Sequence, residues 1–130
     1  MSLNAYKNAH KSAETPRQTE YRLFSDVTAA LTEAKRTEAR GAPLVEALDW
    51  NRRLWTTLSE DCIAPENALP VPLRAQIISL GLWVSRYASE VARGDADIDA
   101  LIDVNRSIME GLAMPGLAGA GRAASLAGHV

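Results

Sequence analysis

The side chains that could carry out chemistry are few, and they form no catalytic or metal-binding pattern. Cys62 is the single cysteine, so no internal disulfide can form, and a lone Cys among apolar residues is usually a small core residue. His10 and His129 have no Cys, Asp or Glu neighbour at metal-ligand spacing. Asp97 and Asp99 fall at an expected helix start, where the helix dipole accounts for them. We therefore expect no metal, no cofactor and no enzymatic activity.

Two asparagines are the polar residues whose positions are most informative. The segment Ala47–Leu58 nearly recurs, 54 positions later, as Leu101–Leu112, with Asp, Asn, Arg and the final Leu identical. In each copy an Asn, Asn51 or Asn105, lies in the middle of an apolar stripe with helical period. A buried amide needs a hydrogen-bond partner. The two Asn are therefore interpreted as a structural polar pair that fixes helix register, as Asn does in coiled coils; partner recognition is the alternative.

Length and charge limit the classes of protein to be considered. The chain has 130 residues and a formal net charge of −2, which predicts one domain and disfavours nucleic-acid binding by charge alone. No apolar run is long enough to cross a bilayer, and the N-terminus lacks the apolar core of a signal peptide. We expect a cytoplasmic protein that binds neither membrane nor, directly, nucleic acid.

The elements that carry these residues are all expected to be helices. Thr15-Pro16-Arg17-Gln18 is a strong start signal, because Thr can cap, Pro suits the first helical position and Gln can complete a capping box. The predicted fold is an all-α, antiparallel four-helix bundle forming a single domain over residues 1–114. A short N-terminal helix precedes it, and a Gly- and Ala-rich, disordered tail over residues 115–130 follows. The expected helices cover residues 3–13, 16–41, 43–62, 72–93 and 97–113.

The helix expected at 72–93 has more apolar surface than one bundle seam requires. Its seam is predicted to be Leu73, Ile77, Leu80, Val84, Tyr87 and Val91. A second apolar side holds Ile78 and Leu82, flanked by the small residues Gly81, Ser85 and Ser89. Either the short helix at 3–13 covers this side, or it is a groove that receives an amphipathic helix of a partner.

Two tryptophans are candidates for the same role. Trp50 and Trp83 sit at the edges of apolar stripes, where indole can either pack or take part in an interface. The predicted partner-binding residues are therefore Ile78, Leu82, Trp83, Ser85 and Trp50.

Five blocks of the chain resemble the FlaF family of flagellar biosynthesis regulators from alphaproteobacteria. They include Glu20-Tyr21-Arg22-Leu23-Phe24, the Asp49-Trp50-Asn51-Arg52-Arg53 motif and its counterpart around Asn105. The blocks span residues 20–24, 47–55, 73–80, 83–87 and 103–112.

The resemblance implies a cytoplasmic, non-enzymatic role in flagellin production. Proteins of this family promote flagellin synthesis and secretion, are thought to bind flagellin as a chaperone, and work alongside the regulator FlbT. The family has no established catalytic residues. Binding to flagellin is the leading expectation. An adaptor that binds FlbT or another flagellar regulator is the alternative, and direct contact with flagellin messenger RNA is a third, which the net negative charge disfavours.

Overall fold

The computed structural model describes residues 15–113, which form four helices and no strand. These are α2 (Pro16–Arg36), α3 (Ala42–Ile63), α4 (Val71–Ala92) and α5 (Asp99–Ala113). The prediction of an all-α bundle is confirmed. The short helix expected at 3–13 and the tail expected at 115–130 lie outside the described residues.

Local sequence signals account for most helix ends. Thr15 accepts a hydrogen bond from the Gln18 amide at 3.1 Å, and the Gln18 side chain accepts one from the Thr15 amide at 3.0 Å, which completes the predicted capping box. Gly94, with φ of +80°, closes α4 by donating to the Val91 carbonyl. Asp97 caps the next helix, because its side chain accepts from the Asp99 amide.

The first long helix is shorter than expected. It was predicted to continue to Gly41, but α2 ends at Arg36. Glu38 adopts the left-handed conformation, with φ of +52°, and the Ala39 amide donates to the Ala34 carbonyl. This is the hydrogen-bond pattern of a glycine-type helix end, here built on Glu38, so no Gly or Pro marks it in the sequence.

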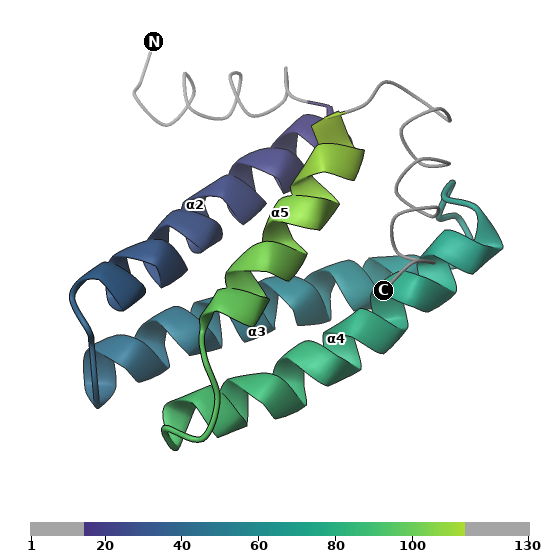
Figure 1. The fold of residues 1–130 in the computed structure, drawn as a ribbon. Coiled ribbons are helices and arrows are strands. Elements are labelled where there is room, and N and C mark those ends of the chain that lie inside the picture. Colours follow the sequence, from purple (N-terminus) through teal and green to yellow (C-terminus); the bar gives the residue numbers. More distant parts are fainter. Residues whose placement is uncertain (1–14, 114–130) are drawn as a thin grey trace, which may run out of the picture.

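The helices pack as two antiparallel pairs that share a core. Figure 1 shows α2 beside α5 and α3 beside α4, and α2 and α3 join the two pairs. α5 meets α4 near the loop that connects them and then diverges from it, so this is the weakest of the four contacts between neighbouring helices. No helix within residues 15–113 is long and apolar enough to cross a membrane.

The core lies where α2, α3 and α5 converge and extends along the inner side of α4. Fully enclosed side chains include Phe24, Leu31, Trp55, Val84 and Leu101. The Phe24 and Trp55 rings meet edge to face, with centroids 5.5 Å apart, an arrangement that adds specific ring attraction to burial.

The seam of α4 differs from the predicted one. Leu73, Ile77, Val84 and Val91 are buried as expected, but Ala88 is buried as well, while Leu80 and Tyr87 are only half-buried. α4 packs mainly against α3 and little against α5. The buried strip is therefore rotated toward α3, which the spacing of large apolar residues could not show.

Candidate functional site

The two asparagines meet at the centre of the bundle. Asn105 Nδ2 donates to Asn51 Oδ1 at 2.8 Å, and neither side chain has any exposed surface. Asn105 Nδ2 also donates to Thr28 Oγ1 at 3.2 Å, and Trp55 Nε1 donates to Asn105 Oδ1 at 2.9 Å. We call Thr28, Asn51, Trp55 and Asn105 the polar centre. It ties together α2, α3 and α5.

The polar centre is closed to solvent, so a partner could reach it only if the bundle opened. This favours the register interpretation of Asn51 and Asn105 over partner recognition. The contributions of Thr28 and Trp55 were not foreseen from the sequence. The sequence indicates the burial of Thr28 only weakly. Thr28 lies four residues after Phe24, which places it on the buried face of α2 beside Val27.

The five predicted partner-binding residues do not form a single surface, although Ile78 and Leu82 are neighbours on one side of α4. Ile78 is half-buried against the core, whereas Leu82 is 63% exposed. Trp83 stacks on Tyr87, with ring centroids 4.7 Å apart. Trp50 lies on a different helix, α3, and is 40% exposed.

The small residues of α4 face α3, so they do not form the floor of a groove beside Leu82. A Cβ atom added at Gly81 would lie 2.4 Å from Ser59 Oγ. Arg52 Nη2 donates to the Ser85 carbonyl at 3.3 Å and to Ser89 Oγ at 3.2 Å. The small residues let α3 and α4 approach closely, which leaves Leu82 outside that contact.

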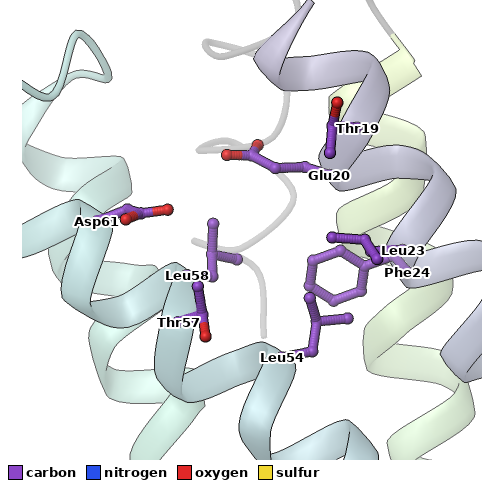
Figure 2. A pocket seen from close by; sticks show the side chains of 8 residues that line it. All are labelled: Thr19, Glu20, Leu23, Phe24, Leu54, Thr57, Leu58 and Asp61. Carbon is purple, nitrogen blue, oxygen red and sulfur yellow. The ribbon is translucent and has the colours of Figure 1, made fainter. Parts of the chain in front are cut away.

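A concave apolar site exists elsewhere, between α2 and α3. It is a crevice of about 360 Å³ that opens to solvent. Its floor is made by the buried side chains of Phe24 and Leu58, and its walls by the half-buried Leu23 and Leu54. Figure 2 shows these side chains together with the polar residues at the mouth. The eight lining residues are Thr19, Glu20, Leu23, Phe24, Leu54, Thr57, Leu58 and Asp61.

The walls of the crevice come from the edges of two apolar stripes. Leu23 and Leu54 each lie at the edge of the apolar stripe of their helix and are half-buried. Trp50, a predicted interface residue, belongs to the same side of α3, because Trp50, Leu54 and Asp61 follow one another at helical spacings of four and seven. The edge position of Leu23 and Leu54 was the signal in the sequence.

The mouth of the crevice is acidic. In Figure 2 the carboxylates of Glu20, from α2, and Asp61, from α3, point toward one another across the opening. Burial, together with the negative charges of Glu20 and Asp61, raises the pKa of the neighbouring Cys62 thiol to about 11, against the opposing effect of Arg74. None of the eight lining residues is basic.

A second hollow lies between α3 and α4, near the opposite end of α3. It has a volume of about 310 Å³ and is lined by residues that include Asp49, Arg52 and Arg93. These charges already have partners: Asp49 pairs with Arg53, Arg93 with Asp95, and Arg52 bonds to α4. The α2–α3 crevice is therefore the better candidate for binding an apolar group.

Comparison with known families identifies the chain. The family model described as flagellar protein FlaF matches residues 2–112. A search among curated proteins found no match, and a search among solved structures found none either. The match takes in all four helices, the polar centre and the crevice. The chain belongs to the FlaF family of flagellar proteins.

Proposed function

We propose that this flagellar protein is a non-enzymatic chaperone that binds flagellin in the cytoplasm and promotes its synthesis and secretion. The observation that carries the proposal is the apolar crevice between α2 and α3. Flagellin has to be kept unpolymerised before export, and its terminal segments are amphipathic helices in the assembled filament. A crevice with apolar floor and walls on a helical bundle suits the apolar face of such a helix.

The size of the crevice also fits this use. Its volume of about 360 Å³ is at the lower end of the range for small-molecule sites, roughly 300–1,000 Å³. It has room for one or two large side chains of a partner. Leu23, Phe24 and Leu54 would contact these side chains, and Trp50 would extend the contact along α3.

A second surface supports the alternative, an adaptor that binds FlbT or another flagellar regulator. Val71, Ile78 and Leu82 share one side of α4 at spacings of seven and four. Val71 and Leu82 are both well exposed, at 66% and 63%. None of these three residues lines either of the two hollows described above.

The two surfaces can be separated with matched substitutions. Leu54→Asp puts a charge in the crevice wall, and Leu82→Asp makes the same change on α4. Titration calorimetry against purified flagellin and, separately, purified FlbT measures the effect, with circular dichroism as the control for folding.

We expect Leu54→Asp to weaken flagellin binding by at least about tenfold, which corresponds to 1.4 kcal/mol. Leu82→Asp should leave flagellin binding nearly unchanged. The opposite pattern would move the flagellin site to α4. If flagellin does not bind while FlbT does, the adaptor function replaces the chaperone function.

A further inference from the structure

Asp61 is an acidic residue at a position where helix stability does not favour one. It lies in the last turn of α3, which contains no basic residue. The C-terminal end of a helix carries partial negative charge, so Lys or Arg is favoured there and Asp is disfavoured. Departures from local rules of this kind concentrate at functional sites.

The Asp61 carboxylate is not used to hold the bundle together. It forms no ion pair with another residue in the part of the chain that the structure describes. Its main chain, in contrast, is engaged: the Asp61 carbonyl accepts from the Ala64 amide and from Asn67 Nδ2. The backbone of the turn is thus fixed, and the carboxylate is held at the mouth of the crevice (Figure 2).

The crevice therefore combines two kinds of surface within a single site. Leu23, Phe24, Leu54 and Leu58 provide the apolar part, and Asp61 with Glu20 provides negative charge directly above it. A partner that fills only the apolar part would leave the Asp61 carboxylate partly desolvated and without a compensating charge from the partner, at a cost in affinity. A partner with a cation beside its apolar residues would remove that cost.

We infer that the crevice recognises an amphipathic helix whose apolar stripe is flanked by Lys or Arg, with a large apolar side chain inserted between α2 and α3 and the cation paired with Asp61. On a helix the two side chains would be three or four residues apart, because residues at that spacing are neighbours on one face. The inference rests on the proposed function, since it defines which segment of a flagellar partner the crevice accepts.

The test uses two synthetic amphipathic helical peptides and the full-length protein. The peptides share one Leu stripe and differ only in having Lys or Glu beside it. Fluorescence anisotropy of labelled peptide gives the affinities for the wild type, for Asp61→Lys and for Glu60→Lys. Glu60 is the matched control, because it is an exposed carboxylate in the same turn of α3 but does not line the crevice. Either Lys substitution suits the helix end, so both variants should fold.

The wild type should bind the Lys peptide at least about fivefold more tightly than the Glu peptide at low salt, and the difference should shrink as salt is raised. Asp61→Lys should abolish or reverse this preference, whereas Glu60→Lys should retain most of it. Leu54→Asp should weaken the binding of both peptides.

Equal affinity for the two peptides, an equal effect of Asp61→Lys and Glu60→Lys, or no binding of either peptide would each overturn the inference. Self-association that is lost in Asp61→Lys, measured by sedimentation, would also overturn it, because the occupant would then be a second copy of the chain. The proposed function is tested separately, by flagellin binding. If flagellin binds the wild type and Asp61→Lys equally well, only the charge preference is contradicted. If the wild type distinguishes the two peptides but does not bind flagellin, only flagellin as the partner is contradicted.

Discussion

The polar centre and the crevice both use α2 and α3, and the polar centre adds Asn105 of α5. The polar groups are the buried ones, and the apolar surface is the one open to solvent. Thr28, Asn51, Trp55 and Asn105 are polar or carry a polar group, and all are buried. The crevice is apolar, and it opens to solvent. A polar group is tolerated in the protein interior when its hydrogen bonds are made. Covering an exposed apolar surface with a partner lowers the free energy.

The two regions therefore have different roles. The polar centre stabilises the bundle, and the crevice is a surface that a partner can bind. Hydrogen bonds have a fixed geometry, so the polar centre specifies how α2, α3 and α5 are aligned. Apolar contact has no fixed direction, so the crevice adapts more readily to the shape of a partner. Changes in the polar centre should therefore reduce stability, and changes in the crevice should reduce binding.

The largest effect on stability is expected from Asn105→Leu. Asn105 takes part in three hydrogen bonds, to Thr28, Asn51 and Trp55. Its loss strands the buried indole N–H of Trp55 and the buried amide of Asn51. We expect the free energy of unfolding to fall by about 3 kcal/mol, since each stranded group costs about 1–3 kcal/mol. Urea denaturation followed by circular dichroism measures it, and a loss below about 1 kcal/mol would show that the polar centre does not fix the bundle.

A smaller loss, about 1–2 kcal/mol, is expected from Asn51→Leu. Asn51 makes one hydrogen bond in the polar centre, and its Nδ2 atom is buried without a partner among the described residues. The double variant Asn51→Leu/Asn105→Leu should lose less stability than the sum of the two single losses. In each single variant the remaining amide is buried without its partner, whereas the double variant contains neither amide. Strictly additive losses would mean that the two side chains are not coupled.

The sequence was sufficient for the architecture because its local signals agree with one another. The capping box at Thr15, the helix end at Gly94 and the apolar periods of α3 and α5 each predicted what the structure has. The end of α2 was missed because Glu38 takes a conformation that only Gly or Asn normally signals. The predicted seam of α4 was wrong at Ala88, because alanine occurs on both buried and exposed helix faces. Ala88 is buried because α4 packs closely against α3.

The candidate site was harder to predict than the fold. Trp50 was chosen for its position at the edge of a stripe, and it lies on the crevice side of α3. Leu23 and Leu54 have that edge position too, but a large apolar residue at the edge can equally well be core. Whether two such edges meet over a hollow depends on how far apart α2 and α3 lie, which is a property of the packed bundle and not of either helix.

The crevice wall should tolerate changes that the polar centre does not. Leu54 is half-buried, so the carboxylate of Leu54→Asp can remain hydrated. We expect the free energy of unfolding to fall by no more than about 1.5 kcal/mol, well below the effect of Asn105→Leu, while flagellin binding falls at least about tenfold. The same denaturation and titration experiments measure both. A loss of stability equal to that of Asn105→Leu would show that the crevice wall is structural core.

The smallest effect is expected at Cys62, which follows Asp61 in α3 and is buried. Its pKa is raised from 9.0 to about 11, first by burial and then by Glu20 and Asp61. The unfolded chain therefore releases the thiol proton at a lower pH than the folded protein does. This contribution to stability is fully present below about pH 9 and is lost as the pH rises from about 9 to about 11. Cys62→Ala should consequently lose less stability than the wild type between pH 8 and pH 10, as measured by the urea midpoint. An identical decline in the two proteins would mean that the thiol is in contact with water in the folded protein, contrary to its burial in the structure.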